Sequence, residues 1–356
     1  MRSALSPRRL IGPLLGIAAL LWLLSRIDYT RLGEHWRGID IRLLLLSILL
    51  AQLSVFVRAL RWRYLLLTTR PIGPRHLYSA VAVNMAANWI LPFRLGEMAG
   101  AYSLRQLEPV PFSTLIASVV VDRILDMVWL AAATLALLSW EWPEQVVIPE
   151  SLFGVTVGIS PKALRVSAIA LAVILATALA FLALLSRGHS RFSRALGRSL
   201  ERVAPRAHRV LGRAGFHFSL GLQVLRQPAH LAMAAALTVV IWGLYLAAVL
   251  LLLWSFPISA HPTALQALAV LVFVAAGLML PNPPAYIGTL HVVIVLALVL
   301  SDPGMSLERA LSFAIVYHLA QLIPTVMIGG AFMWWDNLSI MPRRDDLPRG
   351  DETSPE

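Results

Sequence analysis

Long apolar runs separated by short polar stretches dominate the pattern of hydrophobic and polar positions. The runs cover roughly 10–25, 41–68, 77–93, 112–139, 163–186, 228–255, 264–281, 285–300 and 307–335. A transmembrane helix needs about 20 residues to cross about 30 Å of hydrocarbon, so not every run can span a bilayer alone. The pattern predicts an all-α polytopic membrane protein with about seven to nine hydrophobic helices. One transmembrane domain is expected over residues 1–340.

Composition supports this fold class. Hydrophobic residues make up 58% of the chain and charged residues 14%, against about 45–50% and about 25% in soluble domains. The chain has 0 cysteines, which excludes disulfides, thiolate nucleophiles and Cys-ligated metal sites. The net charge of +11 indicates contact with anionic lipid headgroups. Nucleic acid is not expected as a partner, because binding it would require a soluble basic face.

The distribution of charge predicts the orientation in the membrane. Nine arginines and one acid lie in 187–226, whereas three glutamates and Lys162 lie in 140–162. The positive-inside bias therefore places 187–226, and the arginine-containing segment 58–75, in the cytoplasm and 140–162 outside. Both chain ends are then cytoplasmic, in the cell inner membrane. A basic amphipathic helix is expected over 191–213, and a disordered tail over 341–356.

Two segments cannot simply cross the membrane in this topology. Segment 77–110 must begin and end inside, and the proline at Pro92 breaks it into a re-entrant hairpin. Segment 264–300 must begin and end outside, and its Pro-Asn-Pro-Pro break leaves either a re-entrant hairpin or two tilted spans. The two units enter from opposite faces, which predicts an inverted-topology repeat. Paired interrupted helices in corresponding positions point to a transporter binding site.

The first hairpin carries the strongest candidate for ligand binding. Arg94 and Glu97 lie three residues apart, on one face of a helix that begins after Pro92, and Asn88 precedes the break. A guanidinium at this place can bind a lipid phosphate through two hydrogen bonds. The alternative is an Arg94–Glu97 ion pair that leaves no group for a ligand and only holds the hairpin together, which we call a structural staple.

The run 112–139 contains three ionisable residues, Asp122, Arg123 and Asp126, near its middle. Charges at this depth are costly unless they are paired. A structural cluster that forms ion pairs with Arg94 or Arg61 is favoured. The alternative is that these residues bind a substrate or transfer a proton.

The second hairpin and the last apolar run supply further polar candidates, Asn282, Tyr286, His291, His318 and Gln321. Buried histidines are more often packing residues, although two of them together could form a proton relay. The residues expected to shape the two hairpins are Pro92, Gly96, Pro281, Pro284 and Gly288.

Common enzyme signatures are absent: the sequence contains no H-E-x-x-H, G-x-S-x-G, Walker or dinucleotide motif. Neither catalysis nor a cofactor or metal is therefore expected.

Four stretches resemble the flippase-like transmembrane domain of lysylphosphatidylglycerol synthases and its stand-alone bacterial relatives. They are Arg58-Ala-Leu-Arg61-Trp62-Arg63, Asn88-x-x-Leu91-Pro92-x-Arg94-x-Gly96-Glu97, Asp122-Arg123-x-x-Asp126, and Pro281-x-x-Pro284-x-Tyr286-Ile287-Gly288-Thr289 with Tyr317-His318-x-x-Gln321-x-x-Pro324. The resemblance covers roughly 40–335. In the family, Arg often stands at the position of Gly100 and Gly at that of Ala285, so these two positions depart from it.

The resemblance implies movement of an anionic phospholipid or isoprenoid-linked lipid between leaflets. Lysine transfer is not expected, since the aminoacyl-transferring domain is missing. The residues expected to contact substrate are Arg94, Glu97, Asn88, Arg61, Asp122, Arg123, Asp126, Asn282, Tyr286, His318 and Gln321. An intramembrane enzyme of lipid synthesis that uses Asp122, Asp126 and His318 is an alternative. Another is an accessory subunit of a separately encoded lipid-modifying enzyme. The sequence is also compatible with self-association into a homo-oligomer.

The topology makes a direct prediction for this naturally Cys-free chain. A cysteine at Arg202 should resist an impermeant thiol reagent added to intact cells, whereas a cysteine at Lys162 or Glu150 should react. Labelling of the Arg202→Cys variant from outside would contradict the topology.

Overall fold

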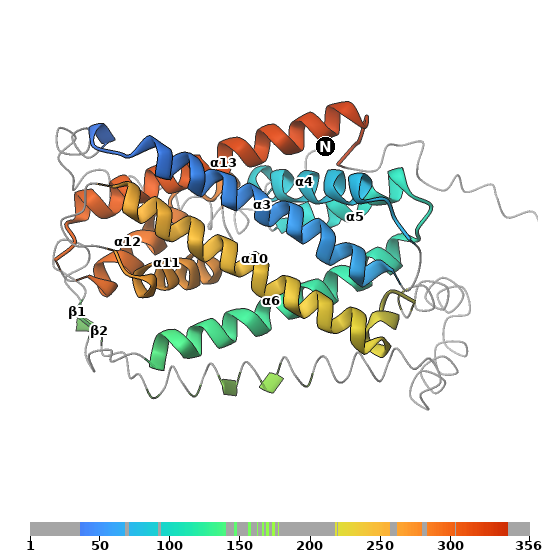
Figure 1. Ribbon diagram of the computed structural model, residues 1–356, viewed down its shortest axis with the longest axis horizontal. Coiled ribbons are helices and arrows are strands. Elements are labelled where there is room, and N and C mark those ends of the chain that lie inside the picture. The colour runs from blue at the N-terminus through green and yellow to red at the C-terminus, as the bar shows by residue number, and fades with distance from the viewer. Residues whose placement is uncertain are drawn as a thin grey trace, which may run out of the picture.

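The computed structural model describes residues 36–67, 71–91, 94–139, 218, 220–256, 262–279, 283–302 and 304–340, with a few positions between 146 and 177 (Figure 1). The first apolar run, most of 163–186, the basic segment 187–217 and the tail 341–356 lie outside the described residues. The predictions for those four regions are therefore not tested by the structure.

The described chain is helical apart from one short strand pair. The helices are α3 (Ile41–Leu66), α4 (Pro74–Ile90), α5 (Gly96–Leu107), α6 (Phe112–Ser139), α10 (Pro228–Ser255), α11 (Ala264–Gly277), α12 (Thr289–Ser301) and α13 (Leu307–Trp335), with 3₁₀ turns η2 (Gln223–Arg226) and η3 (Pro284–Tyr286). Strands β1 (Val146–Val147) and β2 (Thr156–Val157) form an antiparallel pair of two residues each. The predicted all-α fold class is confirmed.

Local sequence signals fix where several helices begin. The Asp40 carboxylate accepts a hydrogen bond of 2.8 Å from the Arg42 amide and caps α3. Thr263 and Gln266 form a reciprocal capping box at α11. Proline occupies the first turn of α4 and of α10, where its missing N–H costs nothing.

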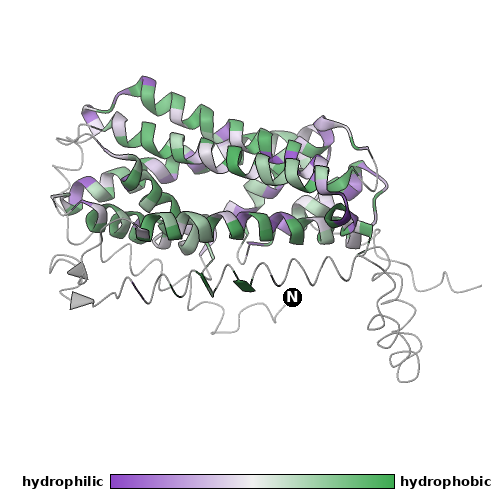
Figure 2. Ribbon diagram, turned by 60° about the horizontal axis from the view of Figure 1, so that its bottom comes forward, coloured by the Kyte–Doolittle hydropathy of each residue, from purple (hydrophilic) through white to green (hydrophobic). Residues whose placement is uncertain are grey.

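Four described segments are long and apolar enough to cross a membrane: Ile41–Leu66, Pro228–Ser255, Pro284–Ser301 and Leu307–Trp335. Helix α6 has 28 residues, which is also sufficient length, but it carries three charged residues near its middle. Figure 2 shows hydrophobic residues along the bodies of the helices and hydrophilic residues gathered toward their ends. This distribution is that of a multi-pass membrane protein.

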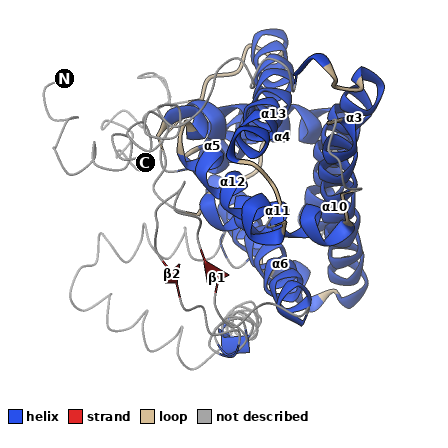
Figure 3. Ribbon diagram, turned by 90° about the vertical axis from the view of Figure 1, so that its left-hand side faces the viewer, coloured by secondary structure: helices blue, strands red, loops and turns tan. Residues whose placement is uncertain are grey.

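Contacts between helix ends show which loops lie together. The Asp40 amide donates to the Ser255 carbonyl at 2.8 Å, so the start of α3 meets the end of α10, and these two helices run side by side (Figure 3). At the opposite end, Asp336 after α13 pairs with Arg75 at 2.6 Å and accepts from Ser79 of α4 at 2.6 Å. This grouping of ends is the one that the predicted topology requires.

The remaining helices form two hairpins, α4–α5 and α11–α12, which extend from opposite ends of the molecule (Figure 1). Their legs have 17, 12, 14 and 13 residues, which corresponds to about 26, 18, 21 and 20 Å. Each leg is shorter than a bilayer core of about 30 Å. The tips meet near the centre, where the rings of Trp89 and Tyr286 lie 5.1 Å apart.

Small residues allow α4 to approach both α5 and α13 closely. A Cβ at Gly96 would overlap the backbone carbonyl of Asn84, and one at Gly100 would lie 2.6 Å from the Asn84 Cβ. On the other side of α4, a Cβ at Gly329 would overlap Ala86. Close backbone approach at small residues is typical of membrane helix packing. The space at Gly100 is therefore filled by α4 and leaves no room for an arginine there.

One sequence prediction about segment 58–75 is wrong. Segment 58–75 was expected in the cytoplasm, but Arg58 and Arg61 of its first part lie in α3 and are buried, with Arg61 0% exposed. They pair with carboxylates on α6 instead of contacting water. The positive-inside rule counts charges without regard to partners, so it could not distinguish these two from Arg63 and Arg75.

The tight α4–α5 contact can be tested with matched glycine substitutions. Gly96→Ala should lower the thermal stability, because overpacking against backbone costs about 1–3 kcal/mol. Gly330→Ala is the control, since nothing lies within 4 Å of the added Cβ. It should be neutral or slightly stabilising. Equal melting temperatures for the two variants in detergent would contradict the described packing.

Candidate functional site

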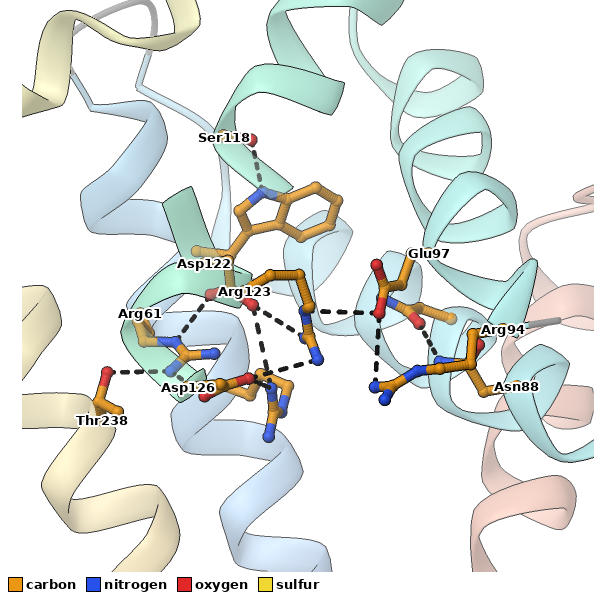
Figure 4. A network of polar contacts seen from close by, with 12 residues as sticks. Arg61, Asn88, Arg94, Glu97, Ser118, Asp122, Arg123, Asp126 and Thr238 are labelled. Carbon is orange, nitrogen blue, oxygen red and sulfur yellow. Dashed lines mark hydrogen bonds and ion pairs between the residues drawn. The ribbon is translucent and has the colours of Figure 1, made fainter. Parts of the chain in front are cut away.

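Seven charged side chains meet where α3, α5 and α6 converge with the first hairpin tip, and all of them except Arg58 are labelled in Figure 4. We call them the central ion cluster: Arg58, Arg61, Arg94, Glu97, Asp122, Arg123 and Asp126. Helical spacing explains why they converge. Arg58 and Arg61 are three residues apart on α3, and Asp122 and Asp126 are four apart on α6, so each pair shares a face.

Arg61 is the most enclosed member. Its Nε lies 2.7 Å from Asp122 Oδ1, and its Nη1 lies 2.6 Å from Asp126 Oδ1. The same Nη1 donates to the Thr238 hydroxyl of α10 at 2.9 Å. A fully buried guanidinium with two carboxylate partners and a hydroxyl ties three helices together. These contacts favour a structural role for Arg61, and the expectation that it contacts substrate stays a prediction.

Asp126 is the carboxylate that the cluster shares most widely. Besides Arg61, it accepts from Arg58 at 3.0 Å and lies 3.3 Å from Arg123 Nη1. The indole of Trp242 on α10 donates to it at 3.1 Å. Burying such charges is not by itself stabilising, but removing one partner leaves another uncompensated, which typically costs about 3–5 kcal/mol.

Glu97 connects this group to the hairpin tip. Its Oε1 lies 3.4 Å from Arg123 Nε and 3.5 Å from Arg94 Nη2. Arg123 has a further contact of 3.0 Å with Asp122. One carboxylate oxygen of Glu97 thus contacts two guanidinium groups, and neither contact is short. The predicted Arg94–Glu97 pair exists, yet it is not closed on itself.

The central ion cluster carries an excess positive charge. Four guanidinium groups face three carboxylates, which leaves one formal positive charge. Arg94 has the fewest carboxylate contacts of the four, and its side chain is 32% exposed. The uncompensated charge is therefore located mainly at Arg94. Its backbone also has a φ of +54°, a conformation that costs a non-glycine residue about 1–2 kcal/mol and is typical of functional positions.

Beside Arg94 lies a cavity of about 180 Å³. Its charged wall contains Arg58, Arg94, Arg123 and Asp126, its polar wall Gln52, Asn88, Tyr245, Tyr286, Tyr317, Gln321 and Thr325, and the remaining wall is apolar. The cavity is smaller than the roughly 300–1,000 Å³ of sites that enclose a drug-sized ligand. It suits a compact polar group whose apolar part remains outside.

Asn88 organises the first tip. Its Oδ1 accepts from the Gly96 amide at 3.0 Å, and its Nδ2 donates to the Asn84 side chain at 2.9 Å. The side chain therefore bridges the two legs across the break. Asn88 was expected to contact substrate, and it does line the cavity, but its polar atoms are used within the hairpin. Pro92 lies outside the described residues.

The second tip has a comparable arrangement. Ala285 and Tyr286 have φ values of +57° and +54°, and Gly288 has +87°. Gly288 tolerates its angle, whereas Ala285 stands in the conformation that glycine adopts more easily. Pro284 begins η3, and Pro281 and Asn282 lie outside the described residues. Of the residues predicted here, Tyr286 and Gln321 line the cavity.

His318 does not line the cavity but stands behind its wall. Its ring stacks on Trp89 at 5.5 Å between centroids, and its Nδ1 lies 3.3 Å from His291 Nε2. The two histidines, which were named together as a conceivable proton relay, are thus in direct contact, and the relay itself stays a prediction.

The sequence predictions missed several contributors to the site, among them Arg58, Gln52, Trp242 and Tyr245. A signal existed for Arg58, which stands three residues before Arg61 and therefore on its face of the helix. No comparable signal existed for Trp242 and Tyr245, which reach the site from α10, more than 100 residues along the chain from α6.

Comparison with known protein families identifies the family of the chain. A family model described as the lysylphosphatidylglycerol synthase TM region matches residues 9–329. No curated protein matches the chain.

The central ion cluster predicts a strong effect of removing its shared carboxylate. Asp126→Asn should destabilise the protein by about 3–5 kcal/mol, because Arg58, Arg61 and Arg123 all lose a buried partner. The control Glu308→Gln removes an acid from the first turn of α13, which should cost at most about 1 kcal/mol. Thermal unfolding in detergent measures both. A similar small effect for the two variants would mean that the cluster does not hold the helices together.

Proposed function

Because the chain belongs to the family of the lysylphosphatidylglycerol synthase transmembrane region, we propose that it is a lipid transporter. In this proposal it moves an anionic phospholipid or isoprenoid-linked lipid between the two leaflets of the cytoplasmic membrane. The family membership and the apolar helices identify a multi-pass membrane protein with a lipid-related role. We propose further that the lipid is moved between leaflets without any covalent change.

The observation that carries the proposal is the excess guanidinium at the cavity wall. A phosphodiester has one negative charge and two free oxygens, and a guanidinium can donate to both oxygens in one plane. Arg94 has a single long carboxylate contact and partial exposure, so it can turn to such a ligand without leaving a buried carboxylate unpaired. Glu97 would keep Arg123. The cluster would then be electrically neutral.

The size and lining of the cavity support a headgroup as the occupant. Its volume of about 180 Å³ is too small for a whole lipid, and its walls combine arginine and amide groups with apolar side chains. We propose that the headgroup enters the cavity while the acyl or isoprenoid chains stay in the bilayer.

The two hairpins supply a mechanism for access from either leaflet. We propose that both are re-entrant, since α4, α5, α11 and α12 are each shorter than the bilayer core. The segment Pro284–Ser301 reaches the length of a span only when η3 is counted together with α12. Broken helices that meet at mid-membrane are typical of transporters that expose one site alternately to each side. Movement of one tip relative to the other would open the cavity to one leaflet at a time.

Orientation follows from the arginines at the two ends. Arg63, Arg75, Arg105 and Arg226 lie at the end formed by the α4–α5 legs. We propose that this end is cytoplasmic, according to the positive-inside bias, and that the α11–α12 legs begin outside.

An intramembrane enzyme is the weaker alternative. Such an enzyme would need a free carboxylate as a general base, but Asp122 and Asp126 each contact at least two guanidinium groups. An accessory role beside a separately encoded lipid-modifying enzyme would predict copurification with that enzyme, and transport by the isolated protein would argue against it.

Variants of Arg94 test the proposal in liposomes that contain fluorescently labelled phosphatidylglycerol. Arg94→Lys should reduce lipid movement substantially, because it keeps the charge but loses the planar pair of donors. Arg94→Gln should abolish movement. Arg42→Gln is the control, since Arg42 is exposed at the start of α3, and it should behave like the unaltered protein.

The double variant Arg94→Gln with Glu97→Gln separates ligand binding from a structural staple. If the pair only staples the hairpin, removing both charges should restore most lipid movement. If Arg94 binds phosphate, the double variant should fold and remain inactive. Near-normal movement in the double variant would therefore overturn the assignment of Arg94 as a ligand.

A further inference from the structure

The interior contains a second polar group that the proposed headgroup site does not use. It consists of His291 in the first turn of α12 and His318 on α13, each 5% exposed. Their rings lie 4.8 Å apart between centroids. They stand directly behind the cavity wall, because Trp89, which lines the cavity, stacks on His318.

The hydrogen bonds around the pair define one arrangement of protons. The Gly288 amide donates to His291 Nδ1 at 3.3 Å. Because that nitrogen accepts, a neutral His291 carries its hydrogen on Nε2, which then donates to His318 Nδ1 at 3.3 Å. A neutral His318 in turn carries its hydrogen on Nε2. Both imidazoles are neutral in this chain of donors and acceptors.

An additional proton cannot enter the pair without breaking a hydrogen bond. A proton on His291 Nδ1 would face the Gly288 N–H, and a proton on His318 Nδ1 would face the His291 Nε2–H. Transfer of a proton from one ring to the other does not restore the lost hydrogen bond. Either the Gly288 N–H or the N–H between the two rings is still left without an acceptor. Proton uptake therefore loosens the contact between the second hairpin tip and α13.

The surroundings offer the protonated pair no compensating anion. The charged and titratable groups on neighbouring elements are Tyr286 of η3, Arg94 of the first tip, Tyr317 of α13 and Tyr245 of α10. Among the described residues, no ion pair joins a carboxylate to His291 or His318, and Glu97 pairs with Arg94 and Arg123 instead. The Nε2 of His318 is buried beside the Ala285 backbone, without a well-formed hydrogen bond among the described residues.

The position of the pair connects it to both hairpins. Trp89 of the first tip lies between the ring of Tyr286, at 5.1 Å, and that of His318, at 5.5 Å. His291 belongs to the second hairpin, and its Nδ1 accepts a hydrogen bond from the amide of Gly288, where the chain turns with a φ of +87°. Loss of either hydrogen bond would thus loosen the packing where the two hairpin tips meet beside the cavity.

We propose that the His291–His318 pair is a proton-binding site that keeps the two hairpin tips together when neutral and releases the second tip on taking up one proton. The closed arrangement is favoured at high pH and is lost as the pH falls, because it exists only with both rings neutral. Its coupling to lipid movement rests on the proposed function. The release of the tip does not.

A nitroxide attached at Ile287→Cys reports on the second tip without requiring transport. Ile287 is 39% exposed and adjoins η3, and the chain contains no other cysteine. In nanodiscs, the electron paramagnetic resonance spectrum should show rising mobility as the pH falls from 8 to 4. His291→Gln and His318→Gln should each give a spectrum that does not change with pH, since the glutamine amide forms hydrogen bonds but does not titrate.

His76→Gln is the control, because His76 pairs with Glu108 far from the tips, at 2.7 Å, and the pH response should persist in it. A mobility that is independent of pH in the otherwise unaltered protein would overturn the proposal. So would a pH response that survives in both glutamine variants of the pair.

The coupling is measured separately by lipid movement in liposomes under an imposed pH gradient. The gradient should accelerate movement by the unaltered protein and have no effect on the His318→Gln variant. Absence of movement under all conditions, together with a pH-dependent spectrum, would contradict the proposed function and leave the proton site intact. Gradient-dependent movement that persists in the His318→Gln variant would overturn the coupling.

Discussion

The structure depends on the cost of placing charge in a medium of low dielectric constant. Seven ionisable side chains lie in the interior of an apolar bundle, where an unpaired charge would be severely unfavourable. Arg58 and Arg61 of α3 can be buried only if α6 presents Asp122 and Asp126 opposite them. Glu97 then draws the first hairpin toward α6. The charge pairing thus specifies how the helices meet, beyond what apolar packing alone requires.

The same constraint accounts for the site. A fully neutralised cluster would have no reason to bind an anion, and a cluster with an isolated buried cation would be too costly. The arrangement lies between these limits, since the one excess charge is placed on Arg94, which is partly exposed to the cavity. The two hairpin tips frame this cavity in related ways. In each, a side chain accepts the backbone N–H at the start of the second leg: Asn88 from Gly96, and His291 from Gly288.

The sequence predicted those features that depend on local spacing. The Asp122, Arg123 and Asp126 group, the break before Arg94 and the relative positions of the loops follow from helical periodicity, proline chemistry and the distribution of arginine. Features that depend on tertiary partners were only partly accessible. The expected pairing of Arg61 with the carboxylates of α6 is confirmed, whereas Arg58 resembled a loop charge because its partner Asp126 lies more than 60 residues away. From the sequence, Gly100 was only a departure from the arginine of the family, whereas the structure places α4 against it.

The central claim is that the excess charge at Arg94 holds a lipid phosphate. Native mass spectrometry of protein extracted gently from its membrane measures this directly, because it shows which lipids remain bound and how many. The account predicts one anionic, phosphate-bearing lipid retained by the unaltered protein and absent from a folded Arg94→Gln variant. Retention of the same lipid by both proteins, or retention of only neutral lipids, would contradict it.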